Sequence, residues 1–173
     1  MQVIVLASFV VMKSKSKSKP RSGCPVSISL ERFGDRWSML IIRDLMVRGF
    51  RTYKEFQHSG EGIATNILAD RLRTLEADGI IAAEAEQTDA RRVNYRLTEK
   101  GIGLAPVLLE LLIWGAKHEA SGASCAVIKN MEKNRAHILA EVRRRWQRRD
   151  ATPLLPQFDP RSVGRAFAKT QQA

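Results

Sequence analysis

Stretches of the chain with apolar residues at helical spacing alternate with short glycine-containing breaks. The first helix is predicted to open at Cys24-Pro25, because a proline in the first turn loses no hydrogen bond, and to stop at Gly34. A second helix is expected to end at Gly49, and its apolar stripe consists of Trp37, Leu40, Ile41 and Leu45.

The next segment has the pattern of two helices joined by a turn. Thr52 and Glu55 have the spacing of a capping box, in which hydroxyl and carboxylate each bond a backbone amide, and they start a short helix. A longer helix is predicted over residues 65–78, with Gly79 as its C-terminal cap and with Leu68, Leu72 and Leu75 buried. This order predicts a helix-turn-helix.

Beyond Gly79 the period changes from helix to strand. Residues 81–86 and 93–97 alternate apolar and polar side chains across a polar turn, which predicts a β-hairpin placed as the wing of a winged helix. Thr98 is expected to cap a long helix to about Glu119, and a last helix is predicted near residues 127–149. The fold class is therefore mainly α with a small β-hairpin: a winged helix-turn-helix with a long dimerisation helix and a C-terminal helical extension.

Charge divides the chain into parts. Lys and Arg number 29 against 18 Asp and Glu, a net charge of +11, yet residues 24–118 carry 13 of each sign. The excess lies at the two ends, where it would attract any polyanion weakly. We expect a disordered basic tail over residues 1–23, a winged helix-turn-helix domain over 24–119, a basic C-terminal helix over 120–150 and an irregular tail over 151–173.

Several classes of protein do not fit this sequence. Two cysteines do not make a disulfide scaffold, and the apolar run at residues 3–12 is half a membrane span, with its positive charges after it rather than before it. The sequence shows no zinc-ligand spacing and no catalytic signature. We therefore expect a cytoplasmic protein that is not an enzyme, uses no metal or cofactor and has no membrane partner.

Taken in order, the motifs resemble those of the HxlR-type winged helix-turn-helix family of bacterial transcription regulators. The resemblance covers about residues 24–119 and implies a homodimer that binds double-stranded DNA at a pseudo-palindromic operator. Ala64 stands where the family often has Ser, so Thr65 is expected to cap the recognition helix. The motifs include Gly34-Asp35-Arg36-Trp37, Arg51-Thr52-Tyr53-Lys54-Glu55-Phe56, Arg71-Leu72-Arg73-Thr74-Leu75 and Asn94-Tyr95-Arg96-Leu97-Thr98.

Within this resemblance, the helix over residues 65–78 is the expected DNA reader, although by itself it could be an ordinary solvated helix. Asn66 faces away from the leucines near the helix N-terminus, where an amide can pair with adenine. Basic residues at the hairpin tip and at the start of the short helix are expected to contact phosphate or a minor groove. The DNA-binding candidates are Arg51, Lys54, Thr65, Asn66, Ala69, Arg71, Arg73, Arg91 and Arg92.

The long helix after Thr98 carries more apolar residues than one domain face needs. Either the wing and the first helix cover them all, or they form a dimer interface, which the resemblance also implies. The interface candidates are Val107, Leu108, Leu111, Leu112 and Trp114.

Cys24 is a candidate redox residue. It stands just before the first helix, where the helix dipole can lower a thiol pKa, and some members of the family sense oxidants through a cysteine in this region. The alternative is an inert thiol. Two other functions stay open beside DNA-binding regulation: a winged-helix protein-interaction module, and a thiol-based sensor built on Cys24. The sequence leaves open whether an oxidant or a small molecule acts as an effector.

Overall fold

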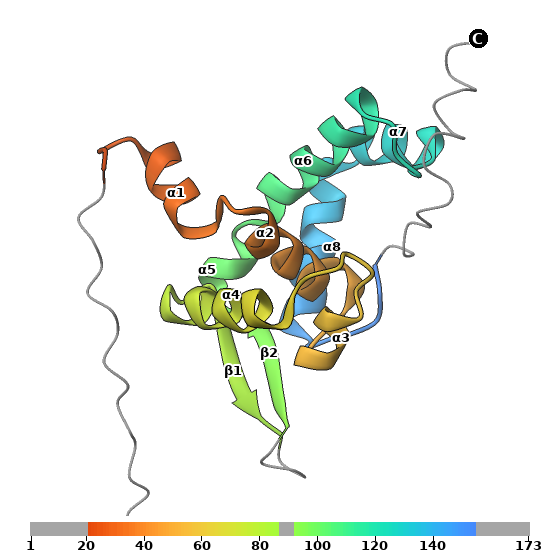
Figure 1. Ribbon diagram of the computed structural model, residues 1–173. Helices are drawn as coiled ribbons and strands as arrows, with labels where there is room; N and C mark the ends of the chain where they lie inside the picture. The colour runs from red at the N-terminus through yellow and green to blue at the C-terminus, as the bar shows by residue number, and fades with distance from the viewer. Residues whose placement is uncertain (1–20, 87–91, 155–173) are drawn as a thin grey trace, which may run out of the picture.

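The computed structural model describes residues 21–86 and 92–154. Its elements run in the order α1 (Pro25–Phe33), α2 (Arg36–Arg43), a π-helical turn η1 (Asp44–Arg48), α3 (Tyr53–Gln57), α4 (Thr65–Ala77), β1 (Ile81–Ala85), β2 (Val93–Leu97), α5 (Glu99–Ile102), α6 (Ala105–His118), α7 (Cys125–Lys133) and α8 (Arg135–Gln147). The hairpin β1–β2 extends from beneath α4, and α6 and α7 lie together at the other end of the molecule (Figure 1). The predicted fold class is confirmed: mainly helical, with α3–α4 as the helix-turn-helix and β1–β2 as the wing.

The ends of the helix-turn-helix follow from local chemistry. Thr52 and Glu55 form the predicted capping box at the start of α3. At the end of α4, Gly79 adopts φ 67°, while the Gly79 and Ile80 amides bond the carbonyls of Glu76 and Leu75, as in a Schellman motif. The predicted leucines form the buried face of α4: Leu68, Leu72 and Leu75.

The wing pairs in antiparallel register, with Ile81 opposite Leu97. Both of these side chains are buried, whereas Val93, near the tip, is 38% exposed. The base of the hairpin therefore belongs to the core, and Tyr95, in the middle of β2, packs against it. A bridge between Thr52 and Asn94 attaches the start of α3 to the wing.

The second helix ends differently from an ordinary α-helix. Its last turn is the π-helical segment η1, and Gly49 follows it at φ 75°. A Cβ on Gly49 would lie 1.8 Å from the Ala151 carbonyl oxygen, so both the backbone and the close approach require glycine there. Ile41, Ile42 and Leu45 are buried, while the predicted stripe residues Trp37 and Leu40 are half-buried.

Two predicted helices are each divided in the structure. Thr98 caps only α5, where its hydroxyl accepts from the Gly101 amide at 3.1 Å. A new helix, α6, begins around Pro106, which cannot donate to the preceding turn. The last helix is likewise broken at Asn134, where φ −116° and ψ 29° separate α7 from α8.

The C-terminal helices share the core of the winged helix. Val142 of α8 is buried in the main apolar cluster, and the Trp146 indole donates to the Leu97 carbonyl at 2.7 Å. The α7 residues Ile128 and Met131 form a second apolar cluster with Leu109 and Ile113 of α6. The extension is therefore packed on the wing and on α6.

Helix α1 contrasts with the packed helices. It stands apart from the rest of the described chain in Figure 1, and its apolar residues Val26 and Leu30 are 65% and 59% exposed. Only Phe33, at its end, packs against the main core.

No helix within residues 21–86 and 92–154 has the length and apolar character needed to span a membrane.

Candidate nucleic-acid interface

Helix α4 presents a polar outer face beside the wing. Thr65, Asn66 and Arg73 are exposed, and Ala69 is half-buried. The Tyr53 hydroxyl donates to the Thr65 carbonyl at 2.8 Å and fixes the start of α4 against α3. The outer face thus combines an amide, a hydroxyl and a guanidinium on a firmly held helix.

The N-terminus of α4 differs from the prediction. Ala64, not Thr65, is the N-cap residue, and Thr65 is the first helical residue. A methyl side chain cannot accept a bond from the first-turn amides. These amides, at the positive end of the helix dipole, suit contact with a phosphate oxygen.

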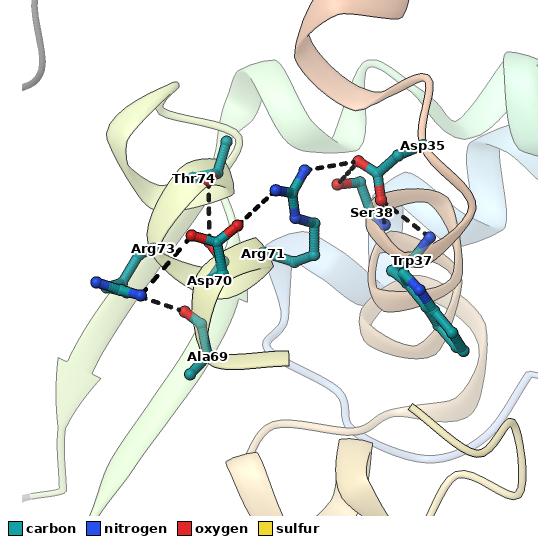
Figure 2. Close-up of polar contacts among 8 residues, drawn as sticks. All are labelled: Asp35, Trp37, Ser38, Ala69, Asp70, Arg71, Arg73 and Thr74. Atoms are coloured by element: carbon teal, nitrogen blue, oxygen red, sulfur yellow. Dashed lines mark hydrogen bonds and ion pairs between the residues drawn. The ribbon is translucent and has the colours of Figure 1, made fainter. Parts of the chain in front are cut away.

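Arg71 connects α4 to α2 rather than pointing outward. Figure 2 shows its guanidinium between two carboxylates, with Nη1 3.3 Å from Asp35 Oδ2 and Nη2 2.5 Å from Asp70 Oδ2. Asp35 also caps α2, where it accepts from the Trp37 and Ser38 amides at 3.0 Å each. One carboxylate therefore starts α2 and holds α4.

These contacts set the ionisation of Asp35. Burial by itself would raise the pKa of Asp35, but the hydrogen bonds from Ser38 and the nearby Arg71 guanidinium outweigh it and hold the pKa below its ordinary value. The Asp35 carboxylate is therefore charged at neutral pH and can pair with the Arg71 guanidinium.

Two other predicted cations stay open to solvent. The Arg73 side chain is 77% exposed, and it reaches back to the Ala69 carbonyl at 3.3 Å and to Asp70 at 3.7 Å. Lys54 lies exposed on α3. Both can meet a phosphate without breaking the fold.

Arg51 takes another position. Its guanidinium donates to the carbonyls of Leu45 at 2.8 Å, Phe50 at 2.7 Å and Asp150 at 3.4 Å, and burial lowers its pKa. Because the side chain turns inward, the geometry does not favour the predicted phosphate contact.

At the wing, Arg92 has a side chain that is 70% exposed, with Glu86 at 3.9 Å. Arg91 lies outside the described residues.

A buried ionic cluster, missed by the sequence reasoning, supports the turn before α4. Asp44 is 2% exposed and pairs with Arg43 at 2.7 Å and Arg48 at 3.2 Å, and Arg43 also reaches Glu61 at 2.9 Å. Burial raises the pKa of Asp44, although both arginines oppose the shift. Arg48 also donates to the Ser59 carbonyl at 3.1 Å. The i, i+4 spacing of Asp44 and Arg48 was the available signal.

The predicted dimer residues on α6 divide into two sets. Val107, Leu111 and Trp114 are 48%, 53% and 55% exposed. Leu108 and Leu112 are half-buried and pack against the main core and the second cluster, respectively. Leu111 also lines an apolar groove of about 750 Å³ between α2 and the helices α6 to α8.

Cys24 is exposed at the N-cap of α1, and the backbone amides of Ser27 and Val26 lower the pKa of its thiol. Cys125 is also exposed, at the start of α7. Over residues 21–86 and 92–154, no cluster of three or more His, Cys, Asp or Glu side chains could hold a metal ion.

Known proteins resemble this arrangement. A family model described as HxlR-like helix-turn-helix matches residues 32–122. The HTH-type transcriptional regulator YybR of Bacillus subtilis strain 168 is 32% identical over 126 residues, a match that covers 70% of this chain and 100% of YybR.

Solved structures of two regulatory proteins are also similar to this chain. The crystal structure of PA1607 has a TM-score of 0.53 and 42% identity over 57% of this chain and 67% of its own. The redox regulator HypR, in its oxidized form, has a TM-score of 0.51 and 33% identity over 56% of this chain and 98% of its own.

Proposed function

We propose that this protein acts in the cytoplasm as a homodimer on a pseudo-palindromic operator. The proposal proceeds from its family: the chain belongs to the HxlR-like helix-turn-helix family of DNA-binding transcription regulators. In this proposal the protein binds DNA and catalyses no reaction. The observation that carries the proposal is the polar outer face of α4, held by α2 and α3 and flanked by the wing.

In this mechanism α4 enters the major groove with its N-terminal end toward the bases. Asn66 pairs with adenine, and Thr65 and Ala69 contact neighbouring base edges or methyl groups. Lys54, Arg73 and the wing residues Arg91 and Arg92 contact the phosphate backbone or the minor groove. Arg71, paired with Asp35, keeps α4 at the correct angle instead of touching DNA.

Two exposed apolar surfaces support the proposed homodimer. Helix α1 exposes Val26 and Leu30, and α6 exposes Val107, Leu111 and Trp114. Packing these surfaces against a second copy would remove them from water, at about 25 cal/mol for each Å² of apolar surface buried. A twofold dimer would place the two α4 helices about 34 Å apart, one turn of DNA.

Selection from randomised duplexes at several salt concentrations tests the DNA-reading assignment. Asn66→Ala should relax preference at one base pair in each half-site, by about 1–3 kcal/mol, and leave the salt slope unchanged. Arg91→Ala with Arg92→Ala should weaken binding to all sequences and reduce the salt slope by up to about two units for each subunit.

Asn130→Ala is the matched control, because Asn130 is an exposed asparagine on α7, away from α4. If Asn66→Ala keeps full preference, α4 is not the reader. If the unaltered protein retains no specific sequence, a protein-interaction module becomes the better description.

A second candidate function is oxidant sensing at Cys24. It is favoured by the exposed thiol with a lowered pKa and by the similarity to HypR, a redox regulator. Peroxide should then release the protein from DNA, and Cys24→Ser should bind DNA without responding. Cys125→Ser is the control, since it removes an exposed thiol from α7. An equal response in the unaltered protein and Cys24→Ser would leave Cys24 a structural role only.

A further inference from the structure

A cavity of about 270 Å³ lies between the wing, η1 and the end of α8. It is separate from the outer face of α4, and its size is near the lower end of ligand sites, which suits a small molecule. Its charged lining comes from four arginines and two acidic residues: Arg51, Arg96, Arg145, Arg149, Glu84 and Asp150.

Arginines outnumber carboxylates in the lining of this cavity. Four guanidinium groups face two carboxylates there, and carboxylates outside the lining act on two of the arginines, Glu55 on Arg51 and Glu141 on Arg145. Arg149 lies 3.2 Å from Glu84, and Arg96 lies 3.9 Å from the same residue, so one carboxylate serves two arginines. Arg145 is paired outside the cavity, with Glu141 at 2.9 Å.

Arg51 makes its direct hydrogen bonds to carbonyl groups. Among the described residues, its guanidinium donates to backbone carbonyls alone, those of Leu45, Phe50 and Asp150. Carbonyl dipoles satisfy the N–H groups but supply no negative charge. The Glu55 and Asp150 carboxylates act on Arg51 without a direct hydrogen bond to its guanidinium, and an anion bound beside this guanidinium would stabilise its charge further.

The rest of the cavity wall is mostly apolar and aromatic, with Asn94 and Thr152 as further polar residues. Leu97 and Val142 are buried behind it, and the Trp146 ring forms one side, with the Arg96 guanidinium 5.3 Å from the ring centroid. A ligand here would place a flat apolar body against Trp146 and its charged end among the arginines. Arginine matches the two oxygens of a carboxylate, because its N–H groups lie in one plane.

We propose that this cavity binds a small organic carboxylate with an aromatic or apolar body. The carboxylate takes the place of Glu84 as partner of Arg149 and Arg96, and the body lies on Trp146.

Such a ligand would act on the wing. Glu84 belongs to β1 and Arg96 to β2, while Arg149 follows α8. Of the two ion pairs that a ligand replaces, Arg149–Glu84 therefore joins the C-terminal extension to the hairpin. Freed from Arg149, the wing would change its position on DNA. This coupling rests on the proposed DNA-binding function, whereas the binding itself does not.

Calorimetric titration of the full chain without DNA tests the binding, with benzoate as the probe. Benzoate should bind one molecule per chain with a dissociation constant below about 1 mM, and neutral benzamide should bind at least about tenfold more weakly. Arg149→Gln should weaken benzoate about tenfold. The Arg149 side chain is 64% exposed, so this variant should keep its fold, and its melting temperature checks that.

Arg148→Gln is the matched control, because Arg148 is exposed next to Arg149 and does not line the cavity. The proposal is overturned if benzoate does not saturate, if benzamide binds equally well, if Arg148→Gln weakens binding as much as Arg149→Gln does, or if inorganic phosphate binds as tightly as benzoate. Failure here leaves DNA selection intact. A protein that binds benzoate but selects no duplex would overturn the proposed function alone.

Discussion

Helices α4 and α6 have nearly the same length, 13 and 14 residues, and both carry leucines at helical spacing. Their outer faces differ. The leucines of α4 are at most 2% exposed and leave a polar surface, whereas α6 buries Leu109 and Ile113 and still shows Leu111 and Trp114 more than half exposed.

The difference indicates what each helix contacts. A helix with one apolar stripe needs one protein surface, and its polar face can meet water or DNA. A helix that is apolar on two sides needs two protein surfaces. In α6 the chain itself supplies one of them, through α7 and α8, and a second copy is the proposed source of the other.

The largest effect should come from the buried side of α4. Leu72 is 2% exposed in the main core, so Leu72→Ala should lower the free energy of unfolding by about 2–5 kcal/mol, through lost burial and the cavity left behind. Ile67→Ala is the control on the same helix, since Ile67 is 37% exposed, and it should cost less than about 1 kcal/mol. Equal losses in urea unfolding would contradict the assignment of the inner face.

Much of the fold around α4 was predictable from the sequence, because the sequence signals that place it are local. The capping box, the glycine after α4 and the change of period at the hairpin place the helix-turn-helix and the wing. The sequence could not show that residues 120–150 pack on the wing. That packing depends on contacts such as Trp146 with Leu97, which lie 49 residues apart. The helix propensity of Asn134 is also not low enough to predict the break between α7 and α8.

The sequence predicted which helix face carries the candidate residues, but not where the long side chains on it point. Helical spacing placed Asn66 and Arg73 on the outer face, where the structure has them exposed. Arg71 and Arg51 were expected to reach DNA, yet a carboxylate 36 residues from Arg71 and three backbone carbonyls around Arg51 hold them. Long side chains follow their tertiary partners, and periodicity does not identify those partners.

The next largest effect should appear on the outer side of α6. Leu111→Glu would place a charge in the proposed interface and should weaken dimerisation about tenfold to a hundredfold, with the monomer still folded because Leu111 is 53% exposed. Sedimentation over a range of protein concentrations measures the change. Val127→Glu is the control, because Val127 is 41% exposed on α7. An unaltered protein that is monomeric at micromolar concentration would overturn the dimer.

The smallest effect should come from the tether that orients the polar helix. Asp35→Asn keeps an oxygen for the α2 cap but removes the charge that faces Arg71, so the free energy of unfolding should fall by roughly 0.5–1 kcal/mol, since both side chains are about one-third exposed. Arg71→Gln should cost a similar amount. The double variant should cost less than the sum, and full additivity in urea unfolding would mean that the pair does not interact.

The pH dependence of this tether has a definite sign. The folded-state pKa of Asp35 is lowered, because bonds from Ser38 and the charge of Arg71 outweigh the opposing effect of burial. A lowered carboxyl pKa stabilises the fold above the unfolded value of about 3.9, and the stabilisation disappears as pH falls through the folded value. The difference between the unaltered protein and Asp35→Asn should therefore be constant from pH 8 to about 5 and shrink below about pH 4. A difference that grows as pH falls would show that Asp35 does not hold α4 as a charged group.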